Sequence, residues 1–299
     1  MTEATVPVDL RNPGQVFACL GLVEAAEVLL RAPCESRFNY TGLQTRATFT
    51  MRSAGECNPI GAVLDFLRRA EVATIVPSNS KLSTRKWDVE DVHGDPFVSS
   101  GPVPKTPATL SVRLLAGGAQ VVLDSWADGP HSARDNVKFW AGSGGYPGSA
   151  LTRDVLELIA AFPDDRVDAL VYDPFAFTAP MSSSFRFDWR RDYIPLDAGF
   201  SPNKHDGITM VGYPLTEILA LIGLQHARPS RFKASDKPKS SPKLNYRYGV
   251  SAALLPTSLA RVVLGAVDIG FPFRTFHMLL GWPGKEGQAR CIVGVREEF

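Results

Sequence analysis

The chain has 299 residues, 32 Lys and Arg against 31 Asp and Glu, and 44% hydrophobic residues. This composition allows one large folded domain or two small ones, and it excludes a disordered chain or a protein that is basic overall. No run of 18 residues is wholly apolar, and the first residues lack a basic segment followed by an apolar one. We therefore expect neither a membrane span nor a secretory signal.

The four cysteines (Cys19, Cys34, Cys57 and Cys291) include no Cys-x-x-Cys pair. This spacing favours reduced thiols of a cytoplasmic protein over a disulfide framework or a zinc site. Cys19 lies on the apolar face of the first predicted helix, which indicates a core position.

The first 77 residues show strand and helix patterns in turn. Alternation of apolar and polar residues predicts strands at 5–10, 37–40, 47–51 and 72–76. Asn12-Pro13 and Asn58-Pro59 each predict a helix start, because Asn caps the unpaired N–H groups of a first turn and Pro fits there. The order β-α-β-β-α-β is that of a ferredoxin-like unit. It predicts one four-stranded antiparallel sheet over residues 5–77, with both helices on one face.

Residues 78–150 read as an irregular insertion. It contains a Ser- and Pro-rich stretch at 78–108, a hairpin of strands 110–115 and 120–125 around Gly117-Gly118, and a glycine-rich loop at 136–149. Residues 151–299 predict a second α+β half, with helices at 151–162 and 213–224. Its predicted strands are 185–190, with one solvent-exposed charged face, and 248–255, 259–267, 274–280 and 289–295. The expected fold class is therefore α+β.

Residues 226–248 are strongly basic, with seven Lys and Arg, one Asp, three Pro and four Ser. Their net charge of +6 leaves −5 for the rest of the chain. Proline content excludes a regular helix or a central strand and favours a long loop or an extended hairpin arm. Basic side chains neutralise phosphates and aromatic rings stack on unpaired bases. The segment thus predicts nucleic-acid contacts, although a solvated charged loop is the alternative. The candidate residues are Arg228, Arg231, Lys233, Lys237, Lys239, Lys243, Tyr246 and Arg247.

Two further stretches are candidates for phosphate contact. Lys81, Arg85 and Lys86 lie beside Trp87, and acids follow them at once. Gly142, Gly144 and Gly145 precede a predicted helix, whose first N–H groups can receive an anion. The glycine pattern is neither a dinucleotide fingerprint nor a P-loop, so a flexible connection is the alternative reading.

Catalytic patterns are sparse. The five histidines form no His-x-His or His-x-x-x-His pair, and only Asp197 with His205 suggests a general base or a metal ligand. A turn rich in Gly, Pro and Asn is the commoner explanation of that stretch. We expect no catalytic residue, no metal and no cofactor, and a half-buried, paired His277.

The opening of the chain resembles a known family. A strand that ends in Asp9 leads through Asn12-Pro13-Gly14-Gln15 into a helix with Ala18-Cys19-Leu20-Gly21-Leu22. This pattern is similar to small subunits of type I-G (formerly I-U) CRISPR effector operons. The stretches FWAGSGG and YPLTEILALIGLQHARP also look like segments of such proteins. The resemblance implies a RAMP-like or large-subunit-like antiviral-defence protein with a ferredoxin-like fold.

The resemblance and the basic segment together predict a non-enzymatic subunit of a Cascade-like interference complex. Its partners would be guide RNA or target DNA, held by their backbones, and neighbouring effector subunits. In such complexes base pairing supplies the sequence specificity. The alternatives are a metal-independent RNA-processing endoribonuclease, with His226 or Tyr246 beside the basic residues, and a pure protein–protein scaffold.

Overall fold

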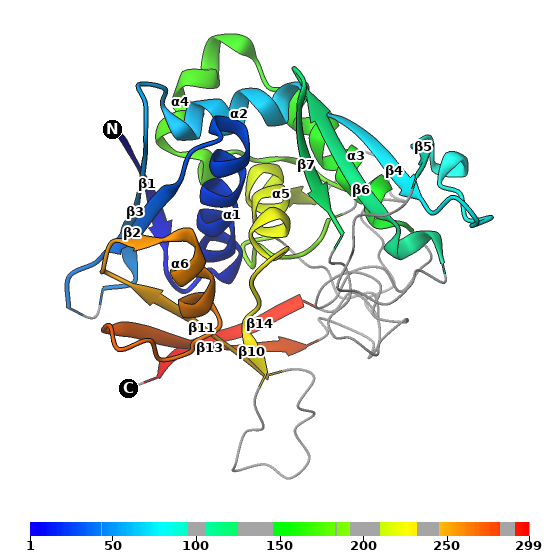
Figure 1. Ribbon diagram of the computed structural model, residues 1–299. Helices are drawn as coiled ribbons and strands as arrows, with labels where there is room; N and C mark the ends of the chain where they lie inside the picture. The colour runs from blue at the N-terminus through cyan, green and yellow to red at the C-terminus, as the bar shows by residue number, and fades with distance from the viewer. Residues whose placement is uncertain are drawn as a thin grey trace.

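The computed structural model describes residues 1–42, 44–94, 106–124, 146–182, 184–191, 210–231, 245–281 and 291–298. These residues form an α+β fold, as predicted, in which three four-stranded sheets surround a central group of helices (Figure 1).

The first sheet has the strand order β1-β3-β2-β12. Its strands are β1 (Thr2–Asp9), β2 (Cys34–Asn39), β3 (Arg46–Ser53) and β12 (Leu255–Pro256). Because β3 pairs antiparallel with both β1 and β2, those two strands run parallel on either side of it. In β1 the buried Ala4, Val6 and Val8 alternate with exposed residues, so only one face of the sheet is covered. Helices α1 (Pro13–Leu30) and α2 (Pro59–Arg69) both contact that sheet.

The position of strand β4 (Glu71–Val76) differs from the predicted sheet. The elements occur in the expected β-α-β-β-α-β order, but β4 leaves the first sheet and joins a second one of order β5-β4-β6-β7. The other strands there are β5 (Glu90–His93), β6 (Ser111–Ala116) and β7 (Ala119–Leu123). The predicted four-stranded sheet over residues 5–77 is therefore wrong. The last four residues of β4 are buried, because β5 and β6 flank this strand and α3 (Gly148–Ala160) packs on it. Both flanking strands come from residues 78–150, which the sequence predicted as an irregular insertion.

The third sheet is built from the C-terminal part of the chain. Its order is β10-β11-β13-β14, with β10 (Ser230–Arg231), β11 (Asn245–Ser251), β13 (Phe273–Gly281) and β14 (Cys291–Glu298), all antiparallel. A two-stranded sheet joins β8 (Ala179–Pro180) to β9 (Val211–Gly212). The remaining helices are α4 (Val167–Tyr172), α5 (Pro214–Gly223) and α6 (Thr257–Leu264), with 3₁₀ turns η1 (Arg85–Trp87), η2 (Pro107–Thr109), η3 (Asp164–Arg166) and η4 (Pro174–Ala176).

Two predicted strands do not form. Residues 259–267 were predicted as a strand from their β-branched content, but most of them belong to α6, which begins directly after Pro256. Proline fixes a backbone angle that suits a helix start, and this local signal outweighs the β-branched residues. Residues 185–190 have no regular structure, and Asp188, expected on an exposed face, is fully buried.

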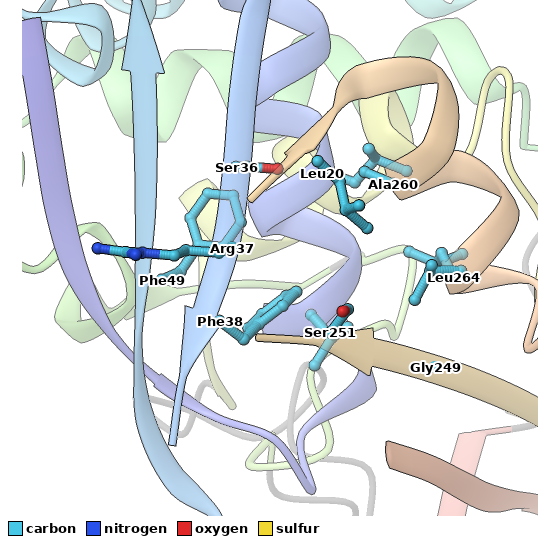
Figure 2. A pocket seen from close by; sticks show the side chains of 12 residues that line it. Leu20, Ser36, Arg37, Phe38, Phe49, Gly249, Ser251, Ala260 and Leu264 are labelled. Carbon is cyan, nitrogen blue, oxygen red and sulfur yellow. The ribbon is translucent and has the colours of Figure 1, made fainter. Parts of the chain in front are cut away.

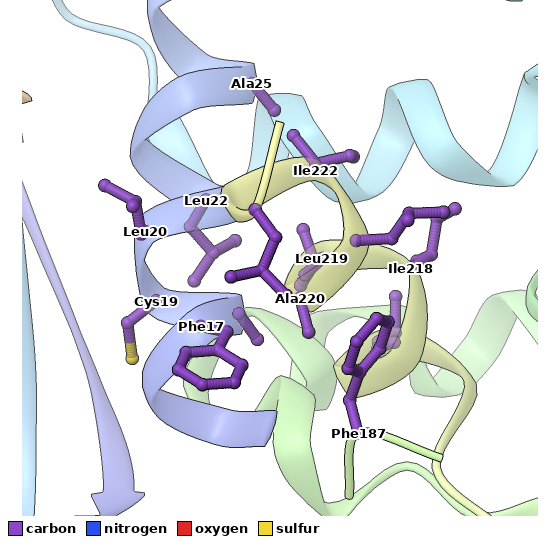
Figure 3. Close-up of a cluster of buried hydrophobic side chains, with 14 of the residues drawn as sticks. Phe17, Cys19, Leu20, Leu22, Ala25, Phe187, Ile218, Leu219, Ala220 and Ile222 are labelled. Atoms are coloured by element: carbon purple, nitrogen blue, oxygen red, sulfur yellow. The ribbon is translucent and has the colours of Figure 1, made fainter. Parts of the chain in front are cut away.

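Helices α1 and α5 form the centre of the hydrophobic core (Figure 3). All residues of α1 from Pro13 to Ala26 are buried, which explains why this helix is apolar all round. By length and composition α1 also meets the criteria for a membrane span, but 78% of it is buried inside the protein. The two helices touch at glycines: a Cβ on Gly21 would lie 1.8 Å from the carbonyl oxygen of Leu219. Core residues come from all three predicted segments of the chain, 1–77, 78–150 and 151–299.

Candidate nucleic-acid interface

The basic segment starts and ends in paired strands. In the register of β10 and β11, Ser230 lies opposite Arg247 and Arg231 lies opposite Tyr246. The chain between them, residues 232–244, therefore connects two neighbouring antiparallel strands. Lys233, Lys237, Lys239 and Lys243 lie in this connection and are outside the described residues.

The flanking arginines differ in their surroundings. Arg228 is partly buried, and burial lowers the pKa of its guanidinium. Arg231 is exposed, and its Nε donates a hydrogen bond of 3.2 Å to the hydroxyl oxygen of Tyr246. Arg231 is thus held at the edge of the sheet, where β10 ends and the lysine-rich connection begins.

Tyr246 is not the stacking residue that the sequence suggested. Its side chain is 0% exposed and points into the core with Tyr248 and Val250. On the neighbouring strand, Phe276 stacks on Tyr248 with ring centroids 5.3 Å apart. Because side chains alternate along a strand, the even residues of β11 face the core and Arg247 faces outward. A base cannot reach the ring of Tyr246 in this conformation.

The outward face carries a row of polar residues across all four strands of the third sheet. Ser230, Arg247, His277 and Arg296 lie opposite one another in register. The side chain of Arg247 is 42% exposed and forms an ion pair of 2.6 Å with Glu298. Arg247 of β11 and Arg296 of β14, on either side of β13, give this face a local positive charge that the single acid Glu298 only partly offsets. Arg296 was missed in the sequence, where only the alternation of its strand pointed to an outward position.

His277 is held between its neighbours in the row. Its Nδ1 accepts a hydrogen bond of 3.1 Å from Arg296 Nε, and its Nε2 lies 3.1 Å from Asn245 Oδ1. Burial and the guanidinium of Arg296 lower the pKa of His277, while Glu298 opposes that effect. The neutral imidazole, with its proton on Nε2, satisfies both contacts. The prediction of a paired histidine is confirmed, but the residue is buried rather than half-buried, at 8% exposed.

The second basic cluster lies elsewhere on the molecule, between β4 and β5 (Figure 1). Lys81, Arg85 and Lys86 are all exposed. Arg85 Nε lies 3.8 Å from a carboxylate oxygen of Asp91, and the ammonium of Lys86 lies 3.9 Å from the ring centre of Trp87. Part of the positive charge of this cluster is therefore already in contact with the Asp91 carboxylate or with the ring of Trp87.

Arg153 of α3 links this cluster to the end of the glycine-rich loop. It donates a hydrogen bond to the carbonyl oxygen of Trp87 and another of 2.6 Å to Asp154. The hydroxyl of Tyr146 donates to the same carboxyl group at 2.8 Å. Tyr146 is the first described residue after the loop, while Gly142, Gly144 and Gly145 themselves lie outside the described residues.

The sequence did not predict a buried polar cluster around Asp188 and Glu217. Asp188 is 0% exposed and accepts hydrogen bonds from Asn12 Nδ2 at 2.9 Å and from Arg190 Nε at 3.0 Å. Glu217 Oε1 accepts from the backbone N–H groups of Phe187 and Asp188, at 3.1 and 3.2 Å. These contacts tie residues 184–191 to the first turns of α1 and α5.

Burial dominates the electrostatics of that cluster. Complete burial raises the pKa of Glu217 to about 7, and the nearby Asp188 carboxylate adds to the rise. The two backbone N–H groups and Arg191 oppose it. The carboxylates of Asp188 and Glu217 are both occupied by protein donors. The cluster therefore fixes the fold rather than presenting a reactive group.

Two cavities adjoin the core. One is a small cavity of about 30 Å³ between β2, α1, α6 and β11, with mostly apolar walls from residues such as Leu20, Phe38 and Leu264 (Figure 2). The side chain of Arg37 points away from this cavity (Figure 2). The other is a cleft of about 310 Å³ between α1, β7 and the end of α5, with the exposed His226 among its lining residues.

In the part of the chain that the structure describes, few side chains are placed to bind a metal ion or to act as a nucleophile. No group of three or more His, Cys, Asp or Glu residues is placed there to hold a metal ion. The four cysteines are free thiols, and only Cys57 is exposed. Asp197 and His205 lie outside the described residues, so their pairing stays a prediction.

Comparisons of the chain with protein-family models, with curated proteins and with solved structures gave no match.

Proposed function

We propose that this protein is a non-catalytic, nucleic-acid-binding subunit of a type I CRISPR interference complex in the cytoplasm. In this role it holds the backbone of guide RNA or of the target strand and contacts neighbouring effector subunits. Base pairing between guide and target supplies sequence specificity, and the protein supplies charge and shape.

The hairpin formed by β10 and β11 carries this proposal. Its connection holds four lysines and one aspartate, and the paired strands bring both ends of the connection together at Arg231 and Tyr246. Arg247 and Arg296 extend the positive charge across the outward face of the same sheet. A lysine-rich connection between two strands of a sheet with a positive outward face suits a phosphate backbone, which carries repeated negative charges.

The fold of the first 53 residues is in keeping with the resemblance. β1, α1 and β2 form a split β-α-β unit with β3 between the two parallel strands. We propose that this unit is a diverged ferredoxin-like half, in which β4 has been diverted to the second sheet. The fourth strand of the first sheet is instead β12, which pairs with β2.

A gel-shift experiment with labelled repeat RNA and a single-stranded DNA of the same sequence tests the proposal. Binding through phosphates alone gives dissociation constants of about 10⁻⁴ to 10⁻⁶ M at physiological salt, so micromolar protein is required. We expect a retarded band of intact nucleic acid. Cleaved RNA would contradict the proposal in favour of an endoribonuclease, and the absence of any shift would contradict it in favour of a scaffold.

A further inference from the structure

The edge of β7 opens into the cleft beside α1. β7 is the last strand of the second sheet, and it pairs only with β6 among the described strands. The cleft is lined by Gln120, Val122 and Asp124 of β7 and its end, and by Glu24 and Val28 of α1. An edge strand therefore forms one wall and a helix forms the other.

The hairpin turn fixes which backbone groups of β7 face the cleft. Gly117 and Gly118 have φ values of +56° and +79°, as a two-residue type I′ turn requires. In such a hairpin the residues flanking the turn, Ala116 and Ala119, exchange hydrogen bonds, and bonded pairs alternate from there. Ala119, Val121 and Leu123 therefore bond to β6. The backbone N–H and C=O groups of Gln120, Val122 and Asp124 point to the open edge.

One of these outward groups already has a substitute partner. The backbone N–H of Asp124 donates a hydrogen bond of 3.0 Å to the side-chain oxygen of Gln225, which occupies the position of a carbonyl on a neighbouring strand. Gln225 is itself fixed by a bond of 2.9 Å from its Nε2 to the carbonyl oxygen of Leu221. Within the described chain, the outward backbone groups of Gln120 and Val122 have no partner.

The side chains of the cleft limit what could occupy it. Val28 is 49% exposed and, with the buried Val121 and Ile222, offers an apolar surface. The charged groups of the cleft walls are acidic. The side-chain carboxylate of Asp124 has no partner among the described residues, and Glu24 is paired with Arg261 at 2.5 and 2.6 Å. Acidic walls disfavour phosphate, and they favour a chain that carries Lys or Arg.

We propose that the cleft between β7 and α1 binds an extended peptide segment of a partner protein, which adds to the second sheet as a strand beside β7. Main-chain hydrogen bonds to Gln120 and Val122 supply affinity in this mode of recognition, and pockets for alternate side chains supply specificity. The segment has an apolar residue against Val28 and a basic residue near Asp124. The inference does not depend on nucleic-acid binding.

The test titrates the full-length protein with a capped hexapeptide of alternating valine and lysine, and with two derivatives N-methylated at either alternate set of amides. We expect binding of the parent peptide, and slower hydrogen exchange in residues 119–124 when it is bound. Only one derivative should lose binding, because only one set of amides faces β7. A valine–glutamate peptide should bind more weakly.

Variants on the protein sharpen the result. Val122→Pro removes the outward N–H and should weaken binding at least fivefold, whereas Val122→Thr keeps that N–H and should bind like the wild type. Asp124→Asn should weaken binding about twofold to fivefold. Glu90→Gln, on the opposite edge of the same sheet, should have no effect. Equal binding of both N-methylated peptides, or no binding of the parent peptide below 1 mM (about the weakest affinity of interest), would overturn the proposal. Protection of residues 119–124 by RNA instead of peptide would also overturn it. The N-methyl comparison needs only the wild type, so it remains decisive if Val122→Pro does not fold.

Discussion

Gly21 of α1 and Gly223 of α5 lie in direct backbone contact. A Cβ on Gly223 would lie 2.7 Å from the backbone nitrogen of Gly21 and 2.2 Å from the carbonyl oxygen of Phe17. Both helices are buried along this contact, so neither can move aside without disturbing the core.

Gly21→Ala should therefore destabilise the protein by about 3 kcal/mol or more, since overpacking of a dense core is costly. Gly61→Ala is the matched control in α2, where the nearest atom to a new Cβ is 3.7 Å away. That control should be neutral or stabilising by about 0.5–1 kcal/mol, because alanine favours a helix over glycine. Urea denaturation of the two variants measures the difference. Equal stabilities would show that α1 and α5 do not pack as described.

The two Asn-Pro helix starts should respond unequally to the same substitution. Asn58 only caps α2, through bonds of 3.0 and 3.1 Å to two N–H groups, and Asn58→Ala should cost about 1 kcal/mol. Asn12 caps α1 and also donates to the buried Asp188. Asn12→Ala should cost about 3 kcal/mol, because it also removes a donor from a buried carboxylate. A thermal melt of each variant checks this order, and an equal loss would contradict the role given to Asp188.

These helix starts also show how far local sequence signals reach. Asn12-Pro13 and Asn58-Pro59 predicted both helices because a cap acts on the two or three residues that follow it. The diversion of β4 was not predictable in this way, since its partner β6 lies some 40 residues further along the chain. Tyr246 was assigned to the basic segment because charged residues surround it in the sequence. No local pattern indicated that β11 begins at Asn245 and turns the ring of Tyr246 into the core. The Asp188 cluster joins residues 176 positions apart, and no local pattern indicates such a contact.

Glu217 should make stability depend on pH. Its folded-state pKa of about 7 exceeds the ordinary 4.5, so between these values the folded protein retains a proton that the unfolded chain has lost. The stabilisation by neutral Glu217 is present at low pH, declines as the pH rises toward 7, and is constant above that. Glu217→Gln cannot titrate, so the wild type should lose roughly 2–3 kcal/mol relative to this variant between pH 5 and pH 8. Urea denaturation across that range measures the difference, and a constant difference would contradict the burial of an ionisable Glu217.

The opposite orientations of Tyr246 and Arg247 predict opposite effects on nucleic-acid binding. Tyr246→Phe removes only a hydroxyl that bonds to Arg231 inside the edge of the sheet, so RNA affinity should stay within about twofold of the wild type. Arg247→Ala removes an outward charge and should lower the dependence of log K on log salt by about 0.7, if it contacts one phosphate. Fluorescence anisotropy with labelled single-stranded RNA measures both. A large loss with Tyr246→Phe would mean that the aromatic ring leaves the core when RNA binds.

The salt dependence of RNA binding tests the central proposal most directly. The measurement compares the wild type with two triple variants. The lysine variant combines Lys237→Ala, Lys239→Ala and Lys243→Ala. The control variant removes three positive charges elsewhere, by changing Arg52, Arg69 and Arg166 to Ala. If the lysine-rich connection holds the backbone, the lysine variant should flatten the slope of log K against log salt by up to about 2, while the control leaves it unchanged. Equal slopes for the wild type and the lysine variant would contradict the account, because the connection would then be a solvated charged loop.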